Sequence, residues 1–384
     1  MGYHPHFGPV TGAIYMKAEP NLAWVALNRV RGLTPRLRAA LLDAFGDPEG
    51  IARAAGAALQ SIPGLPPRAL SDLGSIATPQ SLRLAREEVG RAHRLGATVL
   101  ACPQREYPDR LREGLPDPPP VLYVQGTLQP GDDPAVAIVG SRRSSAYGTE
   151  VARRLAYDLA SRGYTVISGL ARGIDTAAHR GALEAGGRTL AVLGCGIDRV
   201  YPASSAGLAR KIASRGALLS EFPLGSRPLA FHFPIRNRII SGLSQAVIVV
   251  EAAEASGSLI TARLATEQGR EVGAVPGAVT SPLSAGANLL IQDGARLVRG
   301  WQDVEELLPD HCRHRPEPGG DSAAELGERA RRILEALSPN APRHIDVVAS
   351  DLRESAGNLL VDLLDLELKR LVVSLPGKHF LRRS

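Results

Sequence analysis

Two hydrophobic periods alternate along the middle of the chain. Unbroken apolar runs, such as AVAIV at 135–139 and TVIS at 165–168, are typical of strands that are buried on both faces. Between these runs the apolar residues recur every four positions, as at Val151, Leu155 and Leu159, which is typical of a helix with one buried face. The alternation of strand and helix at this spacing predicts an α/β fold with a doubly wound parallel sheet.

The N-terminal part of the chain has a different pattern. Residues 20–79 predict short helices, and the turns GLTP and GLPP between them resemble those of helix-hairpin-helix units, which present backbone N–H groups to phosphates. A small helical bundle whose turns are only connectors is the alternative. The next segment, 81–96, predicts a charged helix that faces solvent.

The C-terminal pattern predicts three helices, then a strand, a Pro-Gly turn and a second strand, which is the order of a winged helix. The third helix, with which such a domain contacts DNA, carries Asp362, Asp365 and Glu367. Because carboxylates on this face repel phosphate, we expect a protein contact or a structural role for this helix.

These patterns together predict four segments. They are a helical domain at 1–80, an extended Rossmann-like domain at 81–312, a linker at 313–324 and a winged-helix-like domain at 325–384. The linker contains the polar stretch EPGGDS, whose glycines and proline are typical of loops.

Ligands of an open parallel sheet bind beyond the carboxyl ends of its strands, where helix N-termini offer N–H groups. The predicted strand at 135–139 is followed by the turn GSRR, and the one at 165–168 by the turn GLARG. Both turns contain glycine and arginine. Glycine lets a phosphate approach the backbone, and a guanidinium binds it through two hydrogen bonds. The residues predicted to bind here are Gly140, Ser141, Arg142, Arg143, Gly169, Arg172 and Gly173. The alternative is a pair of turns with exposed arginines. For Asp175 and His179 we expect a helix cap and a packed histidine.

Further candidates come from 226–238, which we interpret as a loop before a helix. Its FHFPIRNR string places Phe233 near Arg236, Asn237 and Arg238, which suits base stacking combined with phosphate neutralisation. The alternative for the phenylalanines is a role as core anchors. Later, Gly257 and Ser258 open a helix after a strand that ends in an acid, and this gives another N-terminus able to accept an anion.

The composition narrows the class of protein. Lys and Arg number 45 against 39 Asp and Glu, and the formal net charge of +6 favours a polyanionic partner. The 3 cysteines are far apart in the sequence, which argues against a disulfide framework and favours a reducing compartment. No apolar run reaches the roughly 20 residues of a membrane span, and the N-terminus lacks a signal pattern, so we expect a soluble cytoplasmic protein.

No pattern in the chain predicts catalysis. Neither a nucleophile with its base nor a pair of carboxylates stands at a defensible spacing, and the GxxxxGK[ST] string of phosphate-binding loops is absent. The HCRH stretch at 311–314 is interpreted as a solvated loop, because no second cluster of ligands accompanies it. We therefore predict no catalytic residue, no metal and no cofactor.

Several strings in a fixed order carry a resemblance to a known family: VGSRRSSAYG, SGLARGIDTAAHRGAL, FPIRNRIISGLS, SGSLITA and GANLLIQDGA. By these strings, the chain resembles the DNA-processing protein A (DprA or Smf) family. The flanks are similar to its SAM-like or helix-hairpin-helix domain and to its winged-helix-like domain. The resemblance implies a cytoplasmic homodimer that binds single-stranded DNA on an extended Rossmann domain. It also implies loading of the RecA recombinase, past single-strand-binding protein, during natural transformation.

The same resemblance implies which residues line the DNA groove. They are Gly140, Ser141, Arg142, Gly169, Arg172, Gly173, Phe233, Arg236, Asn237 and Arg238.

Two rival functions fit parts of the pattern. A nucleotide phosphoribohydrolase-like enzyme has a similar sheet and a PGGxGTxxE string, but the nearest match here, SGSLIT, has Thr261 where the glutamate would fall. A regulator that binds duplex DNA through the tail would need a basic third helix, and that helix is acidic.

Overall fold

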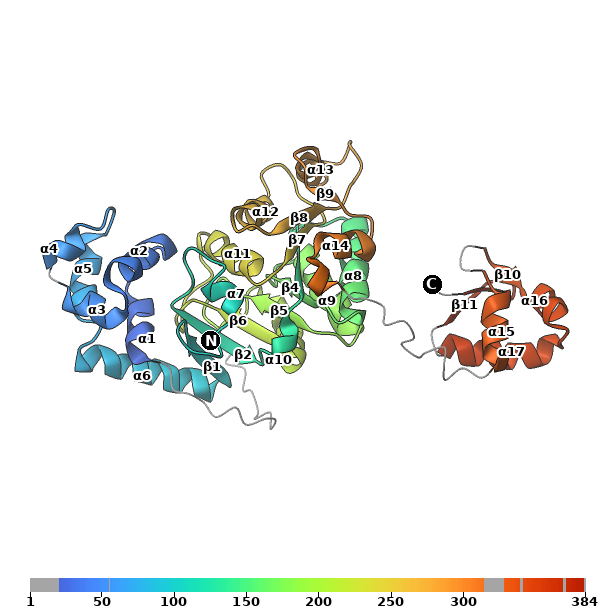
Figure 1. Cartoon of the computed structure of the whole chain (residues 1–384), viewed down its shortest axis with the longest axis horizontal. Helices are drawn as coiled ribbons and strands as arrows, with labels where there is room; N and C mark the ends of the chain where they lie inside the picture. Colours follow the sequence, from blue (N-terminus) through green and yellow to red (C-terminus); the bar gives the residue numbers. More distant parts are fainter. Residues whose placement is uncertain (1–20, 55, 314–327, 339–340, 369–370, 383–384) are drawn as a thin grey trace. The chain divides into compact units, whose positions relative to one another are not determined.

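The computed structural model describes residues 21–54, 56–313, 328–338, 341–368 and 371–382 (Figure 1). The chain divides into two compact units, Met1–Arg313 and His314–Ser384. The predicted linker lies outside the described residues, except for its first residue. Within the described ranges, no helix is long and apolar enough to cross a membrane.

The first unit is built on a sheet whose described strands follow the order β1-β2-β6-β5-β4-β3-β7-β8-β9. The strands are β1 (Ala97–Ala101), β2 (Val121–Gly126), β3 (Ala135–Val139), β4 (Thr165–Ser168), β5 (Thr189–Val192), β6 (Ala217–Ser220), β7 (Ala246–Val249), β8 (Glu271–Ala274) and β9 (Arg296–Leu297). Strands β3 to β9 run parallel, whereas β1 and β2 add an antiparallel edge. The order reverses at β3, which lies between β4 and β7, and parallel sheets form their ligand crevice at such a switch point.

Helices cover both faces of this sheet, which confirms the predicted α/β fold. They are α7 (Asp109–Arg112), α8 (Ala146–Ser161), α9 (Ile174–Glu184), α10 (Ala206–Arg215), α11 (His232–Gly242), α12 (Gly257–Glu267), α13 (Ala285–Gln292) and α14 (Trp301–Leu307). Along β3, Val136 and Ile138 enter the core formed with α8 and α9, whereas Ala137 and Val139 enter the core formed with α11 and α12. Both sets of side chains are buried, which explains the unbroken apolar run.

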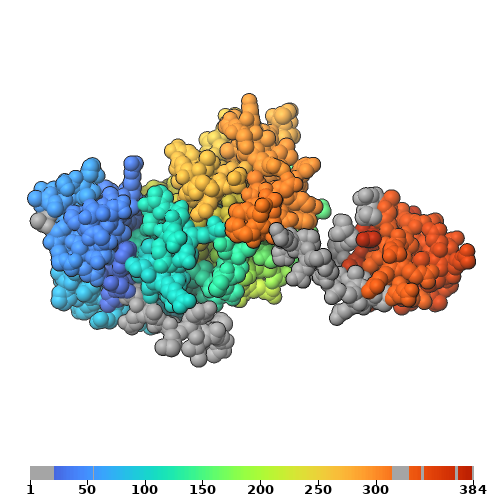
Figure 2. Space-filling model, in the orientation of Figure 1, coloured from blue at the N-terminus to red at the C-terminus, as the bar shows by residue number. Residues whose placement is uncertain are grey.

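The N-terminal helices pack against the antiparallel edge of the sheet. They are α1 (Leu22–Arg29), α2 (Pro35–Phe45), α3 (Pro48–Arg53), α4 (Gly56–Gln60), α5 (Pro67–Gly74) and α6 (Pro79–Arg94). Val25 and Leu27 of α1 and Val89 of α6 share one hydrophobic core with Val121 and Tyr123 of β2. Figure 2 shows these helices directly against the segment that contains β1 and β2.

The expectation that the charged helix, now α6, only faces solvent is wrong. One side of α6 is buried, and Glu88 is 1% exposed. The Glu88 carboxylate accepts hydrogen bonds from the Tyr123 hydroxyl at 2.7 Å and the Leu224 amide at 3.1 Å, and it pairs with Arg29. A buried carboxylate with these partners ties the N-terminal helices to the sheet.

The second unit has its own core and the order of a winged helix. Its elements are α15 (Glu328–Ala336), β10 (Arg343–His344), α16 (Ile345–Leu352), α17 (Ala356–Leu368), β11 (Val372–Leu375) and β12 (His379–Arg382). Leu359, Leu363 and Leu366 of α17 are buried, whereas Val361 is 69% exposed. Asp362 on the same helix pairs with Arg329 at 2.8 Å. The third helix therefore shows solvent a mixed acidic and apolar surface.

We expect Glu88→Ala to lower the free energy of unfolding by about 2–3 kcal/mol, because it leaves the buried Tyr123 hydroxyl and Leu224 amide without their acceptor. Glu87→Ala, which changes an exposed residue one position earlier on the same helix, is the matched control. Urea unfolding of both variants measures the difference. Equal stability of the two variants would show that the Glu88 contacts contribute nothing to folding.

Candidate functional site

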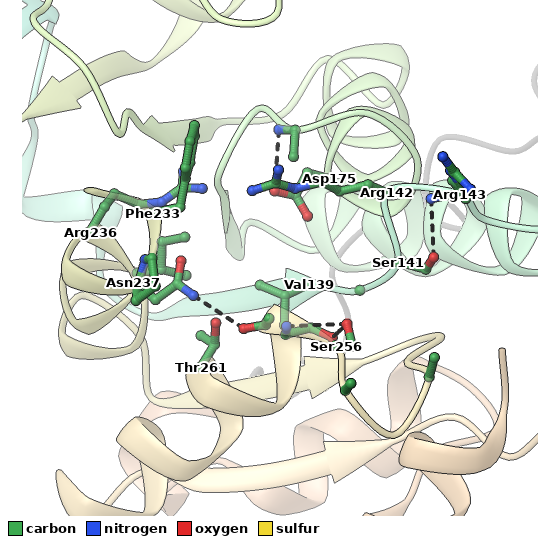
Figure 3. Close-up of a pocket in the computed structure, with 18 of the residues that line it drawn as sticks. Val139, Ser141, Arg142, Arg143, Asp175, Phe233, Arg236, Asn237, Ser256 and Thr261 are labelled. Atoms are coloured by element: carbon green, nitrogen blue, oxygen red, sulfur yellow. Dashed lines mark hydrogen bonds between the residues drawn. The ribbon is translucent and has the colours of Figure 1, made fainter. Parts of the chain in front are cut away.

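A cavity of about 560 Å³ opens at the switch point of the sheet, where segments following β3, β4 and β7 meet the start of α11 (Figure 3). Its lining joins residues that are more than 100 positions apart in the sequence. The predicted residues that line it are Gly140, Ser141, Arg142, Arg143, Phe233, Arg236, Asn237, Gly257 and Ser258. Gly169, Arg172, Gly173 and Arg238 do not line it.

Glu251, which follows β7, holds the turn after β3 in place through hydrogen bonds. The Glu251 carbonyl accepts from the Ser141 amide at 2.7 Å, and its carboxylate accepts from the Ser145 amide and hydroxyl at 2.9 and 2.6 Å. Glu251 is only 3% exposed. The Glu251 carbonyl fixes the start of the turn and its carboxylate fixes the end, so Arg142 and Arg143 are left at the exposed mouth of the cavity.

No local sequence pattern singles out Glu251. The only signal is a strand that ends in an acid, and this signal points to the helix that follows. The partner of the acid, Ser145, lies 106 positions earlier, so only the folded sheet brings the two together.

The turn after β4 supports the site without lining it. Its Gly169 and Ala171 amides donate to the Asp175 carboxylate at 3.1 and 3.3 Å, so Asp175 binds this turn and Gly173 occupies the cap position of α9. The expected cap role of Asp175 is thus wrong. Burial raises the pKa of Asp175, and the nearby Arg236 opposes this.

His179 is packed in the interior, as expected. It is fully buried, and its Nδ1 lies 2.7 Å from the Thr189 hydroxyl. Burial lowers the pKa of His179 to about 3, so the imidazole is neutral at physiological pH.

The expectation of a loop is wrong for the segment that contains Phe233, Arg236, Asn237 and Arg238. This segment is the first part of α11. Pro234 lies in the first turn of the helix, where an amide has no acceptor within the helix, so a proline is tolerated there. The helix places Phe233 and Arg236, three positions apart, on one face toward the cavity.

Arg236 is a buried cation in the wall of the cavity. It is 3% exposed, and its Nη1 donates to the Gly169 carbonyl at 2.7 Å and to the Val192 carbonyl. Burial lowers the pKa of Arg236 to about 10, with Asp175 acting in the opposite direction. The side chain is therefore still charged at pH 7, and it contributes positive potential from a fixed position.

Arg238 points away from the cavity. It is 5% exposed, and its guanidinium lies 2.5 Å from Glu221 and donates to the Asp117 carbonyl at 2.7 Å. This placement does not favour the predicted contact with phosphate, since both Nη atoms of Arg238 already have protein partners. The structure instead shows Arg238 as an anchor for the back of α11.

The N-terminus of α12 forms the opposite wall of the cavity. The Ser256 hydroxyl caps the helix by accepting from the Ser258 amide at 3.3 Å. Asn237 of α11 donates to the Gly257 carbonyl at 3.3 Å and links the two walls. A Cβ added to Gly257 would meet no atom within 4 Å, so nothing in the fold requires glycine here.

Comparison with known proteins follows the same division of the chain. A family model described as DNA recombination-mediator protein A matches residues 98–309, and one described as DprA winged helix domain matches residues 316–378. These matches confirm the resemblance and the winged helix that the sequence predicted.

Individual relatives extend over most of the chain. Protein Smf of Escherichia coli (strain K12) is 42% identical over 290 residues, which are 72% of this chain and 76% of that protein. Protein Smf of Synechocystis sp. is 31% identical to this chain, and the match covers 94% of this chain and 98% of that protein. The X-ray structure of DNA processing protein A (DprA) from Streptococcus pneumoniae superposes with a TM-score of 0.60 and 35% identity, covering 77% of this chain and 99% of that one.

Two glycines, one in the supporting turn after β4 and one in the cavity wall, allow a direct test of the packing around Arg236. A Cβ on Gly169 would lie 2.2 Å from Arg236 Nη1, whereas one on Gly257 meets open space. We expect Gly169→Ala to lower the free energy of unfolding by about 1–3 kcal/mol and Gly257→Ala to leave it nearly unchanged, as chemical denaturation would measure. Similar stability of the two variants would contradict the fixed position of Arg236.

Proposed function

Because this chain belongs to the DNA recombination-mediator protein A family, we propose that it binds single-stranded DNA and delivers it to the RecA recombinase during natural transformation. The observation that carries the proposal is the cavity in which exposed Arg142, buried Arg236, the ring of Phe233 and the N-terminus of α12 meet. Cationic groups beside an aromatic ring are the combination that flexible single strands require.

The parts of the site suit different parts of a nucleotide. Arg142 and the N-terminus of α12 suit phosphate, since the guanidinium presents N–H donors and the helix end carries positive potential. Phe233 suits an unstacked base. Bases in a duplex are already paired and stacked, so we propose that single strands bind in preference to duplex DNA. Such binding weakens steeply with salt and depends little on sequence.

We propose a binding role without catalysis. Asp175 is the one carboxylate that lines the cavity in the described part of the chain, and two backbone amides hold it in place. Thr261 also lines the cavity. It stands where a nucleotide phosphoribohydrolase-like enzyme would carry its glutamate, and its side chain has no carboxylate. These features support binding of the DNA strand rather than its cleavage.

The partners in this proposal rest on family membership alone. They are a second copy of the chain, RecA, and single-strand-binding protein, whose removal from DNA clears the way for RecA. Two sites on one dimer would raise the effective concentration of DNA at each site. For the winged helix we propose a protein contact, because α17 presents Asp362 and apolar side chains where other winged helices present cations.

We expect Arg142→Ala to weaken binding of a single-stranded oligonucleotide about five- to tenfold, because one exposed phosphate contact is removed. The slope of log K against log salt should also become shallower by about 0.7. Fluorescence anisotropy at several salt concentrations measures both, and thermal unfolding should be unchanged because Arg142 is exposed.

Arg154→Ala is the matched control for this change. Its side chain is 79% exposed on α8 and does not line the cavity. If Arg154→Ala weakens binding as much as Arg142→Ala, the effect comes from net charge and the assigned site is wrong.

We expect a chain that ends at residue 313 to keep most of the affinity for single-stranded DNA. This truncation removes the winged-helix unit and leaves the compact unit that holds the cavity. An anisotropy titration of both proteins at one salt concentration measures the difference. Complete loss of binding in the shorter chain would favour a regulator that acts through the tail.

A further inference from the structure

The ring of Phe233 is already surrounded by protein. The Arg142 guanidinium carbon lies 4.7 Å from its centroid, and the Tyr201 ring centroid lies 5.6 Å away at a tilt of 46°. On another side the backbone of Gly194 is so close that an added Cβ would lie 2.9 Å from the ring. Phe233 therefore has little free ring surface for more than one base.

The next ring outward has the free surface that Phe233 lacks. Tyr201 is 46% exposed, and it lies in the loop after β5, next to the cavity wall formed by Phe233. Exposed Arg199 belongs to the same loop, and the carboxylate of Asp198 is engaged by the Gly225 amide at 2.9 and 3.1 Å. The loop thus exposes an aromatic ring two positions along the chain from an exposed arginine.

A more exposed ring nearby has different contacts. Phe231 is 61% exposed, but its ring packs against the His232 ring at an interplanar angle of 78°, with the two centroids 4.6 Å apart. His232 in turn stacks on Phe222 at 4.1 Å. Phe231 therefore belongs to an aromatic group that does not include Arg142, whereas Tyr201 contacts Phe233, the ring over which Arg142 lies.

We propose that Tyr201 is a second stacking position, which takes the nucleotide base adjacent to the base that meets Phe233 and Arg142. The inference rests on the proposed binding of single-stranded DNA and extends its path from the cavity onto the loop after β5. The tyrosine ring would stack through its π face, so the position tolerates any base. Stacking of a base on Tyr201 needs neither the hydroxyl nor a charge on this side chain.

The test removes a base and a ring in turn. An oligothymidylate series, in which each member has one abasic site at a different position, is titrated by anisotropy against the wild-type protein, Tyr201→Ala, Tyr201→Phe, Phe233→Ala and Phe231→Ala. We expect Tyr201→Ala to weaken binding about tenfold and to become insensitive to the abasic site at one position. Phe233→Ala should lose its sensitivity at the neighbouring position, and Tyr201→Phe should behave as the wild-type protein.

Several outcomes would overturn the assignment of Tyr201. Unchanged affinity and an unchanged abasic profile in Tyr201→Ala would do so. Loss of sensitivity at the same position in Tyr201→Ala and Phe233→Ala would show that Tyr201 only supports the ring of Phe233. An equal effect of Phe231→Ala would show that any exposed ring near the cavity suffices.

The wild-type titration and Arg142→Ala separate this inference from the proposed function. If the wild-type protein binds oligothymidylate and Arg142→Ala weakens that binding, a silent Tyr201→Ala removes the second stacking position alone. If the wild-type protein does not bind, the proposed function and the stacking position are both wrong. Thermal unfolding of each variant verifies that it is folded.

Discussion

A buried guanidinium at the carboxyl ends of two parallel strands fixes the geometry of the site. Arg236 donates to the carbonyls of Gly169 and Val192, which lie where β4 and β5 end. A charge in the interior is tolerated only with such partners, because removing a partner leaves an uncompensated buried ion. The need to keep them explains why Gly169 has no room for a side chain. The hydrogen bonds of Arg236 also hold the first turn of α11, and with it Phe233, at the switch point of the sheet.

A buried ion pair holds the opposite side of the same helix. Arg238 pairs with Glu221, and the Glu221 carbonyl accepts from the Asn28 side chain at 2.9 Å. Asn28 also accepts from Arg38 of α2 at 2.8 Å. The N-terminal helices are therefore connected to α11 through hydrogen bonds between buried groups, and not only through the shared hydrophobic core. This connection gives these helices a structural role at the site, whether or not they contact DNA.

The arginines of this chain divide into two kinds that composition cannot separate. Arg142 and Arg172 are exposed to solvent, so an anion can approach them directly. Arg236 and Arg238 are buried, and their first role is to satisfy carbonyls and carboxylates of the fold. Positive potential from Arg236 still reaches the cavity, because a charge acts over several ångströms in a medium of low dielectric.

The sequence by itself determined the strands, their alternation with helices and the glycine-containing turns that follow them, since these depend on period and local turn chemistry. It also determined the family, because the matching strings stand in a fixed order. Only the tertiary structure decided which residues meet. It brought Glu251 under the turn at Ser141, buried Arg238 behind α11, and placed Tyr201 beside Phe233. These contacts join segments that are tens of residues or more apart, and no local pattern records them, because the packing of the whole sheet sets the distances between its loops.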